Sequence, residues 1–423
     1  MWDWGTQPFN TVITTFVFAV YLTSSSFGST NFTSKALATS TAIAGVLIAL
    51  LAPVLGQQAD RAGRAVFHLR WQTWLLAAIS ASLFFIAPEP QYLIPGLVLL
   101  GIGSIISELA GVNYNATLEQ VASTRNVGRV SGFGWGMGYL CGIVVLLVIY
   151  MVFIAPGTLD DGLDIRYSML VCGAWTLLFT IPTFLVLRDQ PAQNRQPVSL
   201  AGAYRRLGGT IARLWREQRQ TFWFLLASAL FRDGLAGVFA FGAVIAAGTF
   251  GFAAGEVIIF GAAANITAGL STIAFGLLDD RLGPRRVILG SLAALSLLGV
   301  LVFVFHDGGK TVFWGLGLLM CLFVGPAQSA SRSFLARLIP EGRSGEIFGL
   351  YATTGRVVSF LSPAMFGLAL TFGELVTGRE NTQYFGILGI VVVLVAGLVA
   401  MLFVAEHHQH GVMAGQPGQT VTD

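Results

Sequence analysis

Long apolar stretches recur along the chain from Thr11 to Val404, and short polar breaks separate them. Each stretch runs for about 18 to 27 residues without alternating polarity, the length that an α-helix needs to cross roughly 30 Å of hydrocarbon. The strands of a membrane barrel would instead be about ten residues long and alternate in polarity. Only 11% of the 423 residues are charged and 55% are apolar, so lipid is the main solvent. The chain is therefore predicted to be an all-α membrane protein.

Twelve of these stretches are predicted to be transmembrane helices that form two pseudo-symmetric six-helix bundles. Their approximate ranges are 9–29, 37–56, 71–88, 93–115, 131–154, 167–187, 221–248, 256–277, 287–305, 312–335, 346–372 and 384–404. The sequence before the first range, Trp2-Asp3-Trp4, is typical of an aromatic anchor at the membrane interface. The predicted division is an N-terminal bundle at 1–188, a cytoplasmic linker at 189–220, a C-terminal bundle at 221–405 and a disordered cytoplasmic tail at 406–423.

Most cations lie in the loops on one side of the predicted helices. Seventeen of the 24 Lys and Arg residues fall there, seven of them between Arg188 and Arg219. Because cytoplasmic loops retain Lys and Arg, the linker and both termini are predicted to be cytoplasmic. The stretch from Tyr204 to Arg219 is predicted to form an amphipathic helix at the membrane surface. The net charge of +3 reflects this topology, and we expect no nucleic-acid binding.

A short motif occurs twice in the chain, at an offset of 220 residues. The copies are Gly56-Gln-Gln-Ala-Asp60-Arg61-Ala-Gly63-Arg64 and Gly276-Leu-Leu-Asp-Asp280-Arg281-Leu-Gly283-Pro-Arg285-Arg286. Gly permits a tight turn and close helix approach, and Asp and Arg can form a charged latch. We interpret both copies as parts of a cytoplasmic gate that forms and breaks as the two halves rock; the alternative is that these loops only fix the topology. The predicted gate residues are Gly56, Asp60, Arg61, Gly63, Arg64, Gly276, Asp280, Arg281, Gly283, Arg285 and Arg286.

Charged and polar side chains inside the predicted helices are candidates for a transport site, because a lone charge in hydrocarbon costs about 2.5 to 3.5 kcal/mol on insertion scales. Helical spacing places Glu108 and Asn115 on one face of the fourth span. An offset of 220 carries Glu108 onto Gln328, and Gln328 is flanked on the tenth span by Ser329 and Arg332. The candidates for a substrate and proton cavity are Glu108, Asn115, Arg232, Asp233, Asn265, Gln328, Ser329, Arg332 and Arg356.

Either Asp233 or Glu108 is the expected proton-coupling carboxylate, because an approaching Arg332 or Arg356 would favour its charged form. The two Arg residues could otherwise bind an anionic group of a substrate, such as a carboxylate. The alternative is that the carboxylates form permanent salt bridges with these Arg residues and only hold the helices together.

The two loop motifs resemble the cytoplasmic motif of the major facilitator superfamily. Further segments narrow the resemblance to its vacuolar effluxer branch, the autophagy-linked amino-acid effluxers and their bacterial relatives. These segments are Trp2-Asp3-Trp4, Thr14-Thr-Phe-Val-Phe-Ala-Val-Tyr21, Tyr114-Asn-Ala-Thr-Leu, Ser131-Gly-Phe-Gly-Trp135-Gly-Met-Gly-Tyr139, Arg232-Asp233-Gly234 and Gly325-Pro-Ala-Gln328-Ser-Ala-Ser-Arg332-Ser. The resemblance covers essentially the whole chain and implies that the first, fourth, seventh and tenth helices line a central cavity.

The resemblance also implies a secondary transporter, either a uniporter or proton-coupled, with a fungal precedent for exporting amino acids. We expect a small polar or zwitterionic organic substrate, such as an amino acid, moved by alternating access with proton coupling. Short loops and scarce Lys favour the plasma membrane of a bacterium. The alternatives are a lipid, amphiphile or drug exporter, and a transport-inactive sensor or scaffold; the Gly-rich fifth span lacks the Pro of drug antiporters. We expect a monomer with no metal, cofactor or enzymatic activity, because the sequence has no phosphate-binding loop, metal-binding His motif or nucleophile elbow.

Overall fold

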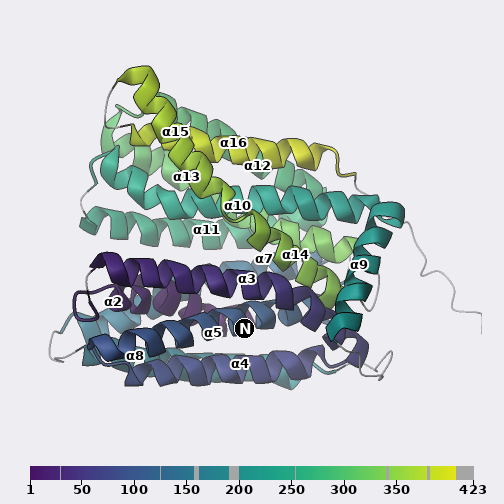
Figure 1. Ribbon diagram of the computed structural model, residues 1–423. Helices are drawn as coiled ribbons and strands as arrows, with labels where there is room; N and C mark the ends of the chain where they lie inside the picture. The colour runs from purple at the N-terminus through teal and green to yellow at the C-terminus, as the bar shows by residue number, and fades with distance from the viewer. Residues whose placement is uncertain are drawn as a thin grey trace, which may run out of the picture.

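The computed structural model describes residues 1–28, 30–123, 125–156, 162–189, 200–252, 254–339, 343–378 and 382–405. Within them the chain is helical apart from short turns, and the helices form two bundles that lie side by side (Figure 1). The predicted tail at 406–423 and residues 190–199 of the predicted linker lie outside the described residues, as does the side chain of Asp60.

The N-terminal bundle is built from six helical segments. The first consists of α1 (Trp2–Pro8), the π-helix η1 (Phe9–Phe16) and α2 (Phe18–Leu22). The others are α3 (Thr30–Ala62), α4 (Ala65–Ser82) with η2 (Leu83–Phe85), α5 (Leu93–Ala116) preceded by η3 (Pro90–Tyr92), α7 (Val127–Ile149) with the π-helix η4 (Tyr150–Ile154), and α8 (Leu163–Val186). The short helix α6 (Leu118–Val121) lies between α5 and α7.

The C-terminal bundle also has six segments. They are α10 (Arg219–Gly248), α11 (Ala254–Leu282), α12 (Pro284–Val304), α13 (Gly309–Leu338), α14 (Ser344–Val358) with α15 (Leu361–Thr377), and α16 (Gln383–Leu402). A turn at Ser359 and Phe360 separates α14 from α15, so the eleventh predicted span is a broken helix. Between the bundles, α9 (Leu200–Glu217) crosses the ends of the long helices (Figure 1).

All twelve predicted spans overlap helical segments, in agreement with the predicted fold. Among the described residues, ten helices are long and apolar enough to cross a membrane. The first and third segments are not among these ten: η1 interrupts the first, and α4 carries His68, Arg70 and Gln72 in its first half.

The start of the first segment differs from the prediction, because the helix begins at Trp2 and not near residue 9. Trp2 is only 6% exposed, its ring stacks on Tyr114 at 4.4 Å, and its indole nitrogen donates a hydrogen bond of 3.0 Å to the Thr73 hydroxyl. The predicted role of Trp2 as an interfacial anchor is therefore wrong. Buried packing partners that are distant in sequence draw the chain into the bundle from its second residue.

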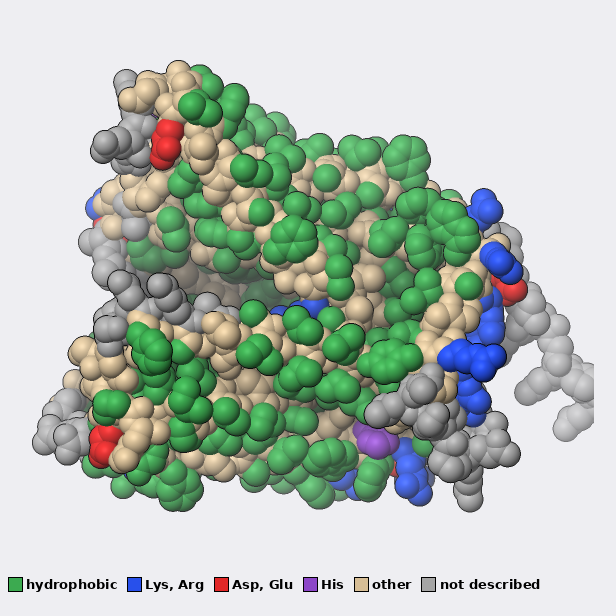
Figure 2. Space-filling model, viewed as in Figure 1, with side chains coloured by type: hydrophobic (Ala, Val, Ile, Leu, Met, Phe, Trp, Pro, Cys, Tyr) green, Lys and Arg blue, Asp and Glu red, His purple; other side chains and the backbone are tan. Residues whose placement is uncertain are grey.

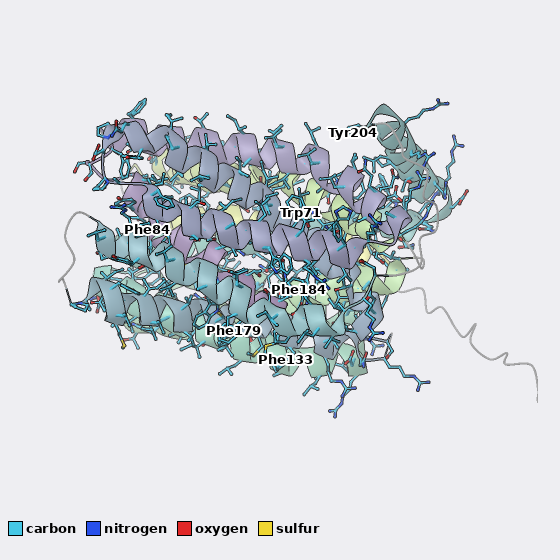
Figure 3. All side chains as sticks on the ribbon, turned by 90° about the horizontal axis from the view of Figure 1, so that it is seen from below. Trp71, Phe84, Phe133, Phe179, Phe184 and Tyr204 are labelled. Atoms are coloured by element: carbon cyan, nitrogen blue, oxygen red, sulfur yellow. The ribbon has the colours of Figure 1, made fainter. Side chains whose placement is uncertain are left out.

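The outer surface suits a lipid environment. Figure 2 shows hydrophobic side chains over the flank of both bundles and Lys and Arg side chains gathered around α9. The side chains of Trp71 and Phe133, labelled in Figure 3, are 43% and 54% exposed. An extended apolar surface of this kind is expected where lipid replaces water. The end of the molecule that carries α9 is called the cation-rich end below.

Two repeat-related interfaces join the bundles, one between α3 and α14 and one between α7 and α11. A Cβ atom built on Gly349 would lie 2.6 Å from the carbonyl oxygen of Ala52, and one on Gly132 would lie 2.7 Å from that of Thr272. Ala52 and Thr272 are 220 residues apart, as are the two motif copies. The internal repeat therefore describes two equivalent helix contacts in which glycine permits close approach.

Candidate functional site

A cavity of about 500 Å³ lies between the two bundles. It is lined by α1, η1, α5 and α7 of the N-terminal bundle and by α10, α13 and α14 of the C-terminal bundle. Figure 2 shows the surface hollowed between the bundles, away from α9. The volume suits a small-molecule site. The lining includes three carboxylates and three guanidinium groups, those of Asp3, Glu108, Asp233, Arg232, Arg332 and Arg356.

Arg332 is only 3% exposed, and its guanidinium group is held by neutral partners. It donates hydrogen bonds of 3.0 and 3.1 Å to the hydroxyl and carbonyl oxygens of Ser131, and one of 3.1 Å to the side-chain oxygen of Asn115. It also lies 5.5 Å from the Tyr114 ring centroid and 6.0 Å from that of Trp135. In the described part of the chain no carboxylate lies within 4.0 Å of Arg332, so its charge is not neutralised by an ion pair.

The carboxylate of Asp3 approaches Arg332 from the other bundle without pairing with it. It accepts a hydrogen bond of 2.5 Å from the Tyr114 hydroxyl. A Cβ atom on Gly134 would lie 2.6 Å from Asp3 Oδ2 and 3.2 Å from Arg332 Nη2, so these two atoms are no further apart than the sum of those distances. Opposite charges therefore face the same small space beside Gly134.

A second charged pair spans the cavity. Arg356 on α14 donates a hydrogen bond of 2.7 Å to Glu108 on α5, and the two side chains are 38% and 35% exposed. Glu108 lies seven residues before Asn115, so the two charged clusters are separated along α5 by about 10 Å. Unlike Arg332, Arg356 joins the bundles through a direct ion pair.

Asp233 has a different environment within the C-terminal bundle. Its carboxylate accepts a hydrogen bond of 2.6 Å from the backbone N–H of Ser362, in the first turn of α15, and the Ser362 hydroxyl donates to the Asp233 carbonyl at 3.0 Å. The residue is 7% exposed. A carboxylate at a helix N-terminus satisfies a free N–H and the helix dipole, so Asp233 stabilises the break between α14 and α15.

Two further donors lie at the cavity wall. Arg232 donates to the carbonyl oxygen of Tyr351 at 2.7 Å, and its guanidinium carbon lies 3.5 Å from the Tyr351 ring centroid. Gly355 leaves the room for this contact, because a Cβ atom there would lie within 1.9 Å of Arg232. Among the described residues, the Arg232 Nε and the Trp135 indole nitrogen are buried and have no hydrogen-bond partner.

The structure brings seven of the nine predicted cavity residues together. Those lining the cavity are Glu108, Asn115, Arg232, Asp233, Gln328, Arg332 and Arg356. Asn265 and Ser329 are placed elsewhere: Asn265 donates to the Gly261 carbonyl within its own helix, and Ser329 donates to Ser131 at the α13 and α7 contact. Four polar lining residues of the first segment were not predicted, namely Asp3, Thr6, Gln7 and Asn10. Their spacing of three, four and seven is the helical polar stripe that would have revealed them.

The second copy of the motif joins the bundles at the cation-rich end. Asp280 accepts hydrogen bonds from the backbone N–H groups of Gly128 and Arg129, at 2.8 and 3.0 Å, in the first turn of α7. Its carboxylate also pairs with the side chains of Arg129 at 3.0 Å and Arg337 at 3.2 Å. Asp279 pairs with Arg337 at 3.0 Å and bonds to Ser333 within the C-terminal bundle. Asp280 is therefore the residue of the predicted latch that joins the two bundles, and its partners lie outside the motif.

The remaining motif residues have mixed roles. Gly56 and Gly276 lie at close backbone contacts with Gly345 and Gly128, and Gly63 and Gly283 adopt positive φ. Arg285 donates to the carbonyl oxygens of Val404 and Leu402 within its own bundle, whereas Arg64, Arg281 and Arg286 are exposed and Arg61 is half-buried. The side chain of Asp60 is not described, so its part in the gate stays a prediction.

Comparison with known proteins identifies the family. The model of the family described as "Vacuole effluxer Atg22 like" matches residues 18–411. The chain belongs to the Atg22-like vacuole effluxer family. This agrees with the resemblance seen in the sequence.

Relatives in this family include bacterial and fungal proteins. The uncharacterised MFS-type transporter YxiO of Bacillus subtilis is 25% identical over 96% of this chain and 94% of its own length. Autophagy-related protein 22 of Coccidioides immitis is 28% identical over 68% of this chain and 50% of its own, and protein 22-1 of Neosartorya fischeri is 30% identical over 58% and 44%. The chain thus aligns with about half the length of these fungal proteins.

Solved structures place this family member in the major facilitator fold. The fucose:proton symporter FucP of E. coli superposes with a TM-score of 0.71 at 12% identity over 96% of this chain and 97% of its own. A bacterial homologue of the iron transporter ferroportin, in an outward-facing state, gives 0.63 at 15% identity over 95% and 96%. With its relatives, this fold makes the chain a multi-pass membrane transporter and not an enzyme.

Proposed function

We propose that the chain is a secondary carrier that moves a small zwitterionic solute, such as an amino acid, across a bacterial plasma membrane. The observation that carries this proposal is the pair of opposite, unpaired charges beside Gly134, at Arg332 and Asp3. A carboxylate of the solute would bind the guanidinium group, and an ammonium group would bind the Asp3 carboxylate. Within a cavity of about 500 Å³, such a site favours a solute that carries both charges.

The arrangement of the bundles supports alternating access as the mode of transport. The cavity lies between them, and the contacts around Asp280 and Gly56 hold them together at the cation-rich end. We take this end to be cytoplasmic, because cytoplasmic loops retain Lys and Arg. The described state would then be closed to the cytoplasm, and rocking of the bundles would open it there.

Proton coupling is assigned to Glu108, in preference to Asp233. Glu108 is paired with Arg356 across the two bundles and is partly exposed to the cavity, so both rocking and protonation would break the same ion pair. Asp233 bonds within its own bundle and supports the N-terminus of α15. These contacts favour Glu108 over Asp233 as the residue at which protonation and bundle movement would compete.

Thermal stabilisation of the purified protein by amino acids tests the proposed substrate class. A ligand that binds only the folded state raises the melting temperature. Arg332→Gln removes charge-assisted hydrogen bonds worth about 1.5 to 3 kcal/mol, so the affinity is expected to fall about ten-fold or more. Asn265→Ala, which alters a polar residue outside the cavity, is expected to keep the stabilisation. If no amino acid stabilises the protein and organic anions without an ammonium group do, the zwitterion assignment is wrong.

A further inference from the structure

Helix α9 is attached to both bundles. It packs against α3 and α10, with Leu207 and Leu214 only 9% and 3% exposed. The Tyr204 hydroxyl donates a hydrogen bond of 3.0 Å to the carbonyl oxygen of Leu50 in α3, and Figure 3 shows Tyr204 where α9 meets the neighbouring bundle. Any force that holds α9 in place therefore acts on the relative position of the two bundles at this end.

The rest of α9 presents two exposed faces with different chemistry. One face is cationic and spans about 100° of the helix. Its members are Arg205, Arg206, Arg213 and Arg216. The other face carries Tyr204, Ile211 and Trp215, which are 40%, 40% and 46% exposed. Glu217 is the one acidic residue of the helix. The two faces lie on either side of the buried face, and a helix with a basic and an apolar exposed face suits a boundary between lipid headgroups and acyl chains.

Aromatic packing gives a second indication that α9 lies at such a boundary. The Trp215 ring lies 5.1 Å from Phe222 and 5.8 Å from Trp223, and the Arg219 guanidinium carbon lies 5.9 Å from the Trp215 ring. Trp223, at the start of α10, is 44% exposed. Trp side chains gather at membrane interfaces. Because α9 crosses the ends of the long helices (Figure 1), its length follows the membrane surface.

We propose that α9 binds the phosphate groups of anionic phospholipids in the adjacent leaflet and thereby holds the bundles together at the cation-rich end. Arg recognises phosphate through paired hydrogen bonds, and the four exposed Arg side chains supply that chemistry. An acidic protein partner would account for the Arg side chains alone. Acyl chains would also cover Ile211 and Trp215, which are exposed on another face of the same helix. Since α9 packs on α3 and α10, bound lipid favours the state closed at this end.

Native mass spectrometry of the full chain tests the binding step. Phosphatidylglycerol is expected to bind more tightly than phosphatidylcholine. The double variant Arg213→Gln/Arg216→Gln is expected to lower phosphatidylglycerol affinity about ten-fold or more. The control Arg125→Gln/Arg188→Gln removes the same charge from exposed positions outside α9 and is expected to keep the affinity.

Equal loss of phosphatidylglycerol affinity in both variants, or equal binding of both lipids, would overturn the proposal. Competition by glycerol phosphate alone would also count against it, because a free headgroup lacks the acyl chains.

A distance measurement tests the conformational step. Spin labels at Ser123→Cys in the N-terminal bundle and Leu282→Cys in the C-terminal bundle report the separation of the bundles at this end; the native Cys141, Cys172 and Cys321 are buried. Phosphatidylglycerol in lipid nanodiscs is expected to increase the short-distance population, and Arg213→Gln/Arg216→Gln to reduce this response. A distance distribution that does not respond to phosphatidylglycerol contradicts the proposed closure, even if the lipid binds.

Discussion

Gly134 separates the two opposite charges of the proposed substrate site. In Gly134→Ala the new methyl group would approach Asp3 Oδ2 at 2.6 Å and Arg332 Nη2 at 3.2 Å, so both side chains must shift. We expect the apparent KM for the substrate to rise several-fold to about ten-fold, since orientation of charged groups governs such binding. Uptake into proteoliposomes measures this change.

The matched control for this change is Gly138→Ala, on the same helix and at the cavity wall. There the nearest atom to an added Cβ is the Gln7 side-chain oxygen at 3.5 Å, an ordinary contact. Gly138→Ala is expected to retain the native KM. If both variants behave alike, the space beside Gly134 has no special part in binding.

The Glu108 and Arg356 pair gives a prediction about pH. Glu108→Gln resembles a permanently protonated carboxyl group and removes the ion pair, so substrate uptake is expected to lose its dependence on an imposed pH gradient. Asp233→Asn is the control: it weakens the cap on α15, with a loss of about 0.5 to 2 kcal/mol in stability, and retains the pH dependence. Uptake measured with and without the gradient distinguishes the two carboxylates, and the reverse result would transfer the coupling role to Asp233.

Prediction from sequence succeeded for residues whose charge is conspicuous in an apolar segment. Glu108, Arg332 and Arg356 stand out because hydrocarbon penalises charge, and all three line the cavity. Asp3 was missed because it precedes the first apolar stretch and resembles a residue at the interface. Its cavity position depends on Tyr114, 111 residues away, and no local pattern specifies that contact.

At the scale of helices, Asp280 joins α11 to the N-terminus of α7. In Asp280→Ala the Gly128 and Arg129 N–H groups lose their acceptor, which is expected to weaken closure at the cation-rich end by about 1 to 3 kcal/mol. Spin-label distances between Ser123→Cys and Leu282→Cys measure the resulting opening, and the long-distance population is expected to rise.

A change within the same motif serves as the comparison for Asp280→Ala. Arg285 holds the Val404 and Leu402 carbonyl oxygens, so Arg285→Gln loosens contacts inside the C-terminal bundle without crossing to the other bundle. The distance distribution is expected to stay near the native one in Arg285→Gln. Longer distances in both variants would mean that the labels report general loosening and not the gate.

The presence of each helix was predictable because a long apolar stretch is a local signal in the sequence. The ends of the helices and the breaks within them were not predictable in this way. Apolar length located twelve helical segments, ten of which are long and apolar enough to cross a membrane among the described residues. The π-helix η1 and the break between α14 and α15 have no comparable pattern. The break depends on Asp233, which supplies an acceptor to Ser362 from another helix. Tertiary partners of this kind determine where a buried helix can be interrupted, since the freed N–H groups need an acceptor.

For the whole molecule, the repeat predicted two equivalent halves, but it did not predict which end is closed. Two packings of the same bundles differ by only a few kcal/mol, so single contacts decide the balance. The contacts at Gly56 and Gly276 are equivalent under the 220-residue offset, and both meet a backbone carbonyl of the other bundle. Equivalent substitutions at these two positions therefore test whether the two interfaces contribute equally to closure during the transport cycle.

Gly56→Ala and Gly276→Ala are both expected to shift the molecule toward opening at the cation-rich end. An added Cβ would lie 2.0 Å from the Gly345 carbonyl oxygen in the first variant and 2.9 Å from that of Gly128 in the second, so backbones must separate and the first variant should open further. Each 1.4 kcal/mol of strain changes the closed-to-open ratio about ten-fold. Spin-label distances between Ser123→Cys and Leu282→Cys measure that ratio.

Gly45→Ala on α3, where a Cβ meets nothing within 4 Å, should leave the distances unchanged. A response to Gly56→Ala without any response to Gly276→Ala would show that the halves do not share the closure equally, and rocking about a symmetric interface would then be the wrong description of this carrier.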